Sequence, residues 1–204
     1  MSKILITALM GYLFGSFQTS YILGKILKKG DIRDYGYGNA GASNTVIAFG
    51  FKYGVIVAMV DILKAVLSIM FIKYLYSASP DTRYFTFLMY LNCIFIILGH
   101  NFPFYMKFRG GKGTASLIGA LLVLDIKIAI IGILAIVAVT LITDYIALGT
   151  MALVSSFAVS TIWFHYSIYC IFIAILIGLM SLIKHLPNIK RILKGTETKL
   201  RNSF

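Results

Sequence analysis

Long apolar blocks, separated by short polar segments, make up most of this 204-residue chain and restrict the folds that it can adopt. They cover residues 4–27, 45–76, 84–98, 117–124, 128–142, 146–164 and 168–183. Apolar runs of about 18 residues or more are typical of transmembrane helices. A chain in lipid must satisfy its own backbone hydrogen bonds as helices or as a closed barrel, and continuous blocks favour helices. The sequence therefore predicts an all-α integral membrane protein with about seven transmembrane helices, some of them short, in a single domain over residues 1–204.

Charged residues make up only 13% of the chain, whereas a soluble domain carries about 25%. Their balance is basic, with a net charge of +12. A basic protein can bind nucleic acid or anionic lipid, but the basic residues here are not interleaved with aromatic ones as nucleic-acid binding would favour. We therefore expect membrane lipid, and no nucleic acid, among the partners.

The positive residues are distributed unevenly between the two sides that alternating crossings define. If every block crosses once, three polar segments share one side, which carries thirteen Lys and Arg residues against four on the other. Cytoplasmic loops are enriched in Lys and Arg. The N-terminus is therefore predicted outside the cell and the C-terminus in the cytoplasm. The block at residues 115–124 is the weak point, because about ten residues are too few for an untilted crossing.

The first of these polar segments to suggest chemistry is "FRGGKG", residues 108–113. Glycines let backbone N–H groups approach a phosphate closely, and Arg109 and Lys112 add positive charge. The apolar run that follows should form a helix whose N-terminus points at the same place. The alternative is a flexible turn whose lysine meets lipid headgroups.

Histidine and amide groups mark two further places. In "HLPNIKR", His185, Asn188 and Arg191 follow at intervals of three and would line one face of a helix. Pro187 is compatible with this only if a new helix begins near it. The alternative is a basic amphipathic tail that rests on lipid. In "GHNFP", His100 either belongs to a site or caps the end of a helix.

The segment "YGYGNAGASN", residues 35–44, is polar and rich in glycine although it lies between apolar blocks. Asn39 and Asn44 offer amide donors and acceptors, and the glycines permit tight turns. Arg33, which precedes the segment, could hold an anion. Taken alone, the segment is interpreted equally well as a flexible loop or as a binding site.

The three polar segments together favour one shared anion site, because all are predicted on one face of the membrane. No Ser-His-Asp or Cys-His order stands out, and three histidines with few carboxylates leave little for a metal site. We therefore expect neither a metal nor a cofactor. Amides, glycines and cations suit a doubly phosphorylated substrate or an acyl phosphate. Within the second apolar block, Asp61 and Lys64 are predicted to pair inside the bundle.

These stretches resemble the motifs of the PlsY family of bacterial membrane acyltransferases, and the resemblance covers nearly the whole chain. "DIRDYG" with "GNAGASN" resembles the first motif, "GHNFPFYMKFRGGKG" the second and "HLPNIKRILKGTETK" the third, while "DILK" at residues 61–64 resembles the second-helix signature. Membership implies seven helices with all three motifs at the cytoplasmic face of the cell inner (plasma) membrane. It also implies acyl transfer from acyl phosphate to glycerol 3-phosphate, giving lysophosphatidate and phosphate for phospholipid synthesis, without a protein nucleophile.

The resemblance implies roles for single residues as well. Lys112, His185 and Asn188 would be catalytic, with Lys112 on a phosphate and the other two orienting the acceptor or the acyl phosphate. The implied substrate-binding residues are Arg33, Asn39, Ser43, Asn44, His100, Arg109, Gly110, Gly111, Gly113 and Arg191. Glu197 and Lys199 would be structural.

Four positions depart from the family pattern. Tyr37 and Ala147 each replace a serine, Ile47 replaces an arginine that binds phosphate, and Gln18 replaces a proline. A lost arginine is hard to replace, and the phenol of Tyr37 would either form a hydrogen bond or fill the pocket. We therefore expect a slow or altered acyltransferase. The alternatives are a degenerate paralogue that binds phosphorylated lipid precursors with little turnover, and a small transporter, which is disfavoured because the polar residues cluster at helix ends.

Overall fold

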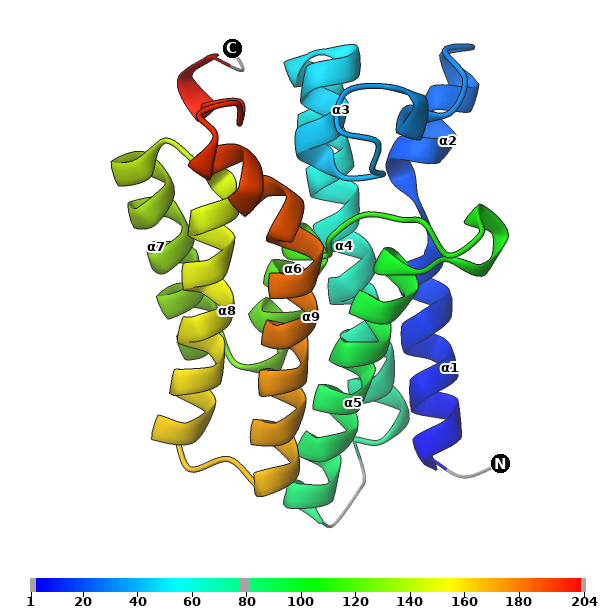
Figure 1. The fold of residues 1–204 in the computed structure, drawn as a ribbon. Coiled ribbons are helices and arrows are strands. Elements are labelled where there is room, and N and C mark those ends of the chain that lie inside the picture. Colours follow the sequence, from blue (N-terminus) through cyan, green and yellow to red (C-terminus); the bar gives the residue numbers. More distant parts are fainter. Residues whose placement is uncertain (1–2, 78–80, 203–204) are drawn as a thin grey trace.

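The computed structural model describes residues 3–77 and 81–202, and the regular elements in those ranges are helical (Figure 1). The α-helices are α1 (Lys3–Ser16), α2 (Thr19–Ile26), α3 (Ala42–Phe49), α4 (Phe51–Leu75), α5 (Thr82–Asn101), α6 (Thr114–Leu124), α7 (Ile126–Thr143), α8 (Ile146–Trp163) and α9 (Ile168–Leu193). Short 3-10 turns lie at Ile32–Asp34, Phe104–Met106 and Leu200–Asn202. Within the described ranges five helices, α4, α5, α7, α8 and α9, are long and apolar enough to cross a membrane. The predicted all-helical class is therefore confirmed.

The first two apolar blocks each form two helices instead of one. Gly50 separates α3 from α4 with a φ angle of +98°, which favours glycine. The break between α1 and α2 lies at Phe17 and Gln18. Gln18 is buried there, and its side-chain nitrogen donates to the backbone carbonyl of His100 at 2.8 Å. The second break depends on the backbone geometry of Gly50, which hydropathy does not reveal, whereas the polar stretch GSFQTS, residues 15–20, already interrupts the first block in the sequence.

Helix α6 is too short for the full crossing predicted for its block. Its 11 residues rise about 16 Å, roughly half of the ~30 Å hydrocarbon core of a bilayer. The helix is buried in the bundle and packs closely on α4, where a side chain at Gly119 would overlap the backbone of Ile62. Helix α6 is therefore a buried, partial segment.

Helix α9 continues beyond its apolar block, through Pro187 to Leu193. The expectation that a new helix begins near Pro187 is wrong. Proline removes one helical N–H group, but the buried face of α9, which includes His185 and Asn188, packs against the bundle and outweighs that local preference. As their spacing predicts, His185, Asn188 and Arg191 therefore share one continuous helix.

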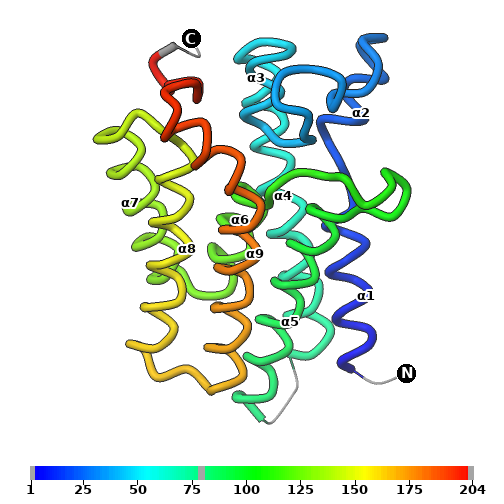
Figure 2. The backbone as a smooth tube through the Cα atoms, viewed as in Figure 1, coloured from blue at the N-terminus to red at the C-terminus, as the bar shows by residue number. Residues whose placement is uncertain are grey.

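Helix α5 packs against α1, α4, α6 and α9, while α7 and α8 form a pair beside α9. The core includes Tyr90, whose ring stacks on Phe157 at a centroid distance of 5.8 Å. Helices α2 and α3 and the C-terminal end gather at one end of the bundle, opposite the N-terminus (Figure 2). The segments before α3 and after α9 are thus brought to the same end.

Candidate active site

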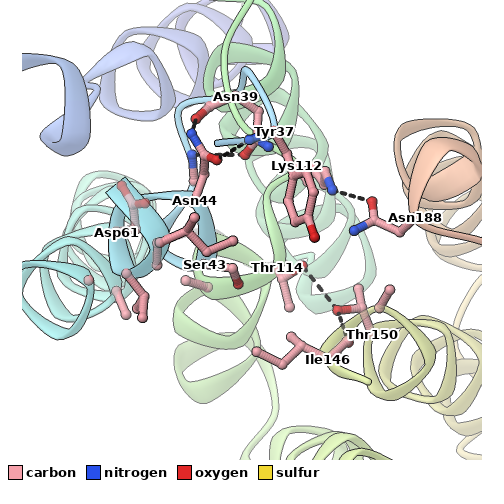
Figure 3. Close-up of a pocket in the computed structure, with 18 of the residues that line it drawn as sticks. Tyr37, Asn39, Ser43, Asn44, Asp61, Lys112, Thr114, Ile146, Thr150 and Asn188 are labelled. Atoms are coloured by element: carbon pink, nitrogen blue, oxygen red, sulfur yellow. Dashed lines mark hydrogen bonds between the residues drawn. The ribbon is translucent and has the colours of Figure 1, made fainter. Parts of the chain in front are cut away.

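A cavity of about 360 Å³ lies where the loop before α3, the beginning of α6 and the segment after α9 come together (Figure 3). The predicted site residues that line it are Asn39, Ser43, Asn44, His100, Lys112, Gly113, His185 and Asn188. They come from all three polar segments of the sequence. Much of the remaining wall is apolar and belongs to α3, α4, α6 and α8.

Lys112 enters this cavity from the glycine-rich segment (Figure 3). Its ammonium donates to the side-chain oxygen of Asn188, whose amide nitrogen donates to Glu197 at 2.6 Å. Burial, with the positive charge of Arg191 nearby, lowers the pKa of Lys112 to about 8, and the Glu197 carboxylate opposes this shift. At pH 7 the ammonium therefore remains largely charged in a poorly hydrated wall, where an anion would bind it strongly.

His185 lies on α9 one turn before Asn188 and is buried in the same wall. Its Nδ1–H group donates to the backbone carbonyl of Ser181 at 2.8 Å. In the neutral ring, Nε2 then carries a lone pair and can accept a hydrogen bond. The cavity thus combines a cationic donor, Lys112, with an oriented acceptor, His185.

Asn44 organises the loop before α3. Its side-chain nitrogen donates to three backbone carbonyls of that loop, those of Ile32, Tyr35 and Asn39, at 3.2, 3.0 and 2.9 Å. Its side-chain oxygen accepts from the N–H group of Tyr37 at 2.6 Å. Because both ends of the Asn44 amide are engaged by the backbone, this residue shapes the cavity wall by fixing the loop.

Tyr37 stands between Gly36 and Gly38, whose φ angles of +54° and +70° lie in the left-handed region. Its hydroxyl lies 2.5 Å from the hydroxyl of Thr198, in the segment after α9. The guanidinium of Arg191 lies 3.9 Å from the centroid of its ring. Of the two expectations for this phenol, the hydrogen bond is confirmed. The Tyr37 ring lines the cavity but does not fill it.

Three arginines predicted for the site lie outside the cavity lining, as far as the structure describes it: Arg33, Arg109 and Arg191. Arg33 pairs with Asp31 at 2.6 Å and donates to two backbone carbonyls of the 106–109 turn. The hydrogen bond from Arg33 also lowers the pKa of the Asp31 carboxyl. Arg109 is exposed, and Arg191 packs on Tyr37. Arg33 therefore braces two loops instead of offering a free cation.

Gly110 and Gly111 do not present their amides to the cavity as the predicted phosphate cradle requires. Their N–H groups donate to the backbone carbonyls of Asn101 and His100 at 3.1 and 3.0 Å. A side chain at either glycine would overlap His100, so close packing explains why glycine stands there. Gly113, with a φ angle of +83°, does line the cavity immediately before α6.

Three further polar residues line the cavity: Glu197, which was expected to be structural, and Thr114 and Thr150, which were not predicted. Glu197 accepts from Asn188 and pairs with Arg191, both at 2.6 Å. A signal was present, because Glu197 is one of only seven acidic residues in a strongly basic chain. The hydroxyls of Thr114 and Thr150 lie 3.3 Å apart. They gave no signal, since threonine is common in membrane helices.

The predicted pair of Asp61 and Lys64 is confirmed, with the two charged groups 2.8 Å apart and both side chains buried. The Lys64 ammonium also donates to the carbonyl of Phe17 at 2.7 Å and lies 3.0 Å from Nδ1 of His100. These contacts use all three of its protons. The pair therefore joins α4 to the break after α1 and to the end of α5, beside the cavity.

Comparison with known proteins places this chain in a family. The family model described as glycerol-3-phosphate acyltransferase matches residues 5–195. Glycerol-3-phosphate acyltransferase 1 from Oceanobacillus iheyensis is 43% identical over 200 residues, which cover 98% of this chain and 96% of that protein. The glycerol-3-phosphate acyltransferase from Halalkalibacterium halodurans is 40% identical over 194 residues, which cover 93% of this chain and 91% of that protein.

Solved structures agree with this assignment. The crystal structure of PlsY, an integral membrane glycerol 3-phosphate acyltransferase, in its glycerol 3-phosphate form matches with a TM-score of 0.85 and 30% identity, covering 97% of this chain and 96% of that one. The lysophosphatidic acid form of PlsY matches with a TM-score of 0.82 and 27% identity, covering 99% and 98%. The resemblance of the three motifs is thus confirmed over the whole fold, and this multi-pass membrane protein belongs to the PlsY family of glycerol-3-phosphate acyltransferases.

Proposed function

We propose that this protein transfers an acyl group from acyl phosphate to glycerol 3-phosphate, giving lysophosphatidate and phosphate for phospholipid synthesis. The observation that carries the proposal is the charged Lys112 beside Asn188 in a cavity whose other walls are largely apolar. Such a cavity suits a substrate with an anionic head and a long apolar chain. The names of the relatives and the two ligand forms of PlsY support the same acceptor and product.

In the proposed reaction, the hydroxyl oxygen of glycerol 3-phosphate attacks the carbonyl carbon of the acyl phosphate. The bond from that carbon to the phosphate oxygen breaks, and phosphate leaves with the bonding electrons and takes up the hydroxyl proton. Lys112 stabilises the charge on the phosphate oxygens. Nε2 of His185 accepts the hydrogen bond of the attacking hydroxyl and orients it. No protein nucleophile is needed.

The apolar wall is the proposed place of the acyl chain. Val55 of α4, Ile118 of α6 and Ile146 of α8 all line the cavity. Val55 and Ile146 are also 41% and 37% exposed on the helix surfaces. An apolar surface that is shared by the cavity and the outside of the bundle lets a lipid-dissolved substrate enter from the bilayer.

The expected result is lysophosphatidate formation when the protein, purified in lipid nanodiscs, is mixed with palmitoyl phosphate and radiolabelled glycerol 3-phosphate. Product should appear in proportion to the amount of protein and should require both substrates. Nanodiscs without the protein serve as the control. Saturable binding of glycerol 3-phosphate without product would instead identify the non-catalytic paralogue.

We further propose seven membrane passes with the cavity at the cytoplasmic face of the inner (plasma) membrane, since the short α6 covers only part of the bilayer but still reverses the direction of the chain between α5 and α7 (Figure 1). The excess of positive residues at the cavity end supports this orientation.

Single cysteines at the exposed positions Lys29 and Lys194 should then resist a membrane-impermeant thiol reagent in spheroplasts until the membrane is permeabilised. A cysteine at Arg83 should react at once. The native Cys93 and Cys170 are buried and give little background, and rapid labelling at Lys194 would contradict this topology.

A further inference from the structure

Residues 196–201, called the roof segment below, fold back across the cavity. The residues of this segment that line the cavity are Glu197, Thr198 and Leu200. The far end of the roof segment is held at the turn between α7 and α8. There the N–H groups of Leu200 and Arg201 donate to the backbone and the side chain of Asp144 at 2.8 and 3.1 Å. The roof segment is therefore part of the cavity wall, and Asp144 anchors one end of it.

Tyr37 holds the other end of the roof segment from the loop before α3. Its hydroxyl lies 2.5 Å from Oγ1 of Thr198. The same hydroxyl oxygen accepts a hydrogen bond from the backbone N–H group of Thr198 at 3.0 Å. These two hydrogen bonds join residues 161 positions apart in the chain. A shorter hydroxyl side chain such as serine would not span the distance, so the contact depends on tyrosine at this position.

A series of contacts between charged and polar side chains connects Tyr37 to Lys112 in the cavity. Arg191 lies over the Tyr37 ring and pairs with Glu197 at 2.6 Å. Glu197 accepts from Asn188 at 2.6 Å, and the side-chain oxygen of Asn188 accepts from Lys112. Contacts therefore run unbroken from Tyr37 to Lys112. The position of the roof segment and the orientation of Asn188 are coupled.

We propose that Tyr37 is a positioning residue that latches the roof segment over the cavity, so that the closed roof turns Asn188 toward Lys112 and keeps water from the acyl phosphate. This role deepens the proposed function and rests on it. Water competes with the glycerol hydroxyl, because its oxygen attacks the same carbonyl carbon and releases fatty acid and phosphate. An open roof therefore diverts acyl phosphate from transfer to hydrolysis.

The test uses the full chain in nanodiscs with matched variants. Tyr37→Phe keeps the ring beneath Arg191 and removes only the hydroxyl. Thr198→Val removes the partner hydroxyl at nearly constant volume. Tyr35→Phe is the control, because the Tyr35 hydroxyl belongs to the same loop but donates to the backbone carbonyl of Lys29 at 2.7 Å.

Opening of the roof segment is measured as the rate of tryptic cleavage after Lys199. Mass spectrometry of the chain detects this cleavage as the loss of residues 200–204. Cleavage requires a locally opened segment, so its rate follows the open fraction when opening is fast. Loss of the Tyr37 hydroxyl should speed cleavage about five- to tenfold. Thr198→Val should have a smaller effect, and the double variant should not exceed Tyr37→Phe, because both changes remove the same contact.

The second measurement is the ratio of fatty acid to lysophosphatidate formed from acyl phosphate at saturating glycerol 3-phosphate. Tyr37→Phe should raise this ratio severalfold, whereas Tyr35→Phe should not change it. Loss of folded protein alone would lower both products and leave the ratio unchanged. The ratio therefore separates positioning from a purely structural role.

Unchanged cleavage in Tyr37→Phe, relative to Tyr35→Phe, overturns the latch. Faster cleavage with an unchanged product ratio overturns the exclusion of water. If the unaltered protein transfers no acyl group, the proposed function fails, while the cleavage rates still decide whether Tyr37 holds the roof segment. Should Tyr37→Phe not fold, Thr198→Val decides the same question from an exposed residue.

Discussion

Replacing Lys112 by alanine should lower kcat/KM for glycerol 3-phosphate by roughly ten- to a hundredfold. A hydrogen bond from a charged group is worth about 1.5–3 kcal/mol, and 1.4 kcal/mol corresponds to about tenfold in rate. The Lys112 ammonium is the cation in the cavity lining that faces Asn188, where the phosphate is proposed to bind. Initial rates of lysophosphatidate formation at varied glycerol 3-phosphate measure the loss.

The matched control is Lys107→Ala, which removes an exposed lysine of the same loop and should leave kcat/KM nearly unchanged. The pH dependence gives a second signature. Since the pKa of Lys112 is about 8, its charge is present below pH 8 and is lost above it, so KM should rise as the pH increases through 8. This rise should be absent in Lys112→Ala. Equal rates for Lys112→Ala and Lys107→Ala would remove Lys112 from the site.

Much of the site could be predicted because regular spacing fixes relative position within a helix. His185 and Asn188 are three residues apart, and α9 places both on the cavity wall. Asp61 and Lys64 have the same spacing and pair as expected. The division of the chain into apolar blocks and polar ends likewise indicated which segments would meet, since crossings bring alternate loops to one side.

The rest depended on contacts between distant segments. No local pattern reveals that the side chain of Gln18, at the break after α1, donates to the carbonyl of His100. The sequence predicted that the amides of Gly110 and Gly111 would bind a phosphate, but they donate to backbone carbonyls at the end of α5. Arg33 resembles a free cation until Asp31 folds beside it. For the two glycines and for Arg33, the sequence indicated flexibility and charge, but the groups that they contact lie elsewhere in the fold and replace the expected phosphate.

Replacing Lys64 by methionine should have the largest effect on stability, lowering the free energy of unfolding by about 3–5 kcal/mol, because it leaves the buried carboxylate of Asp61 without its counter-charge. Both side chains are almost fully buried, at 5% and 2% exposure. Cys93 and Cys170 are also buried, so a thiol-reactive dye that fluoresces on reaction reports thermal unfolding in detergent. The midpoint should fall by several degrees relative to the unaltered protein.

The double variant Asp61→Leu with Lys64→Met distinguishes an unpaired charge from lost packing. Replacing both members of a buried ion pair by apolar groups is often close to neutral, whereas removing one member is not. The double variant should therefore recover most of the lost stability. Recovery should be incomplete, because the carbonyl of Phe17 and Nδ1 of His100 still lose their donor. A double variant as unstable as Lys64→Met would show that these two contacts, and not the charge of Asp61, account for the stabilisation by Lys64. In that case the role of the ammonium is to tie the break after α1 to the end of α5, which also fixes His100 beside the cavity.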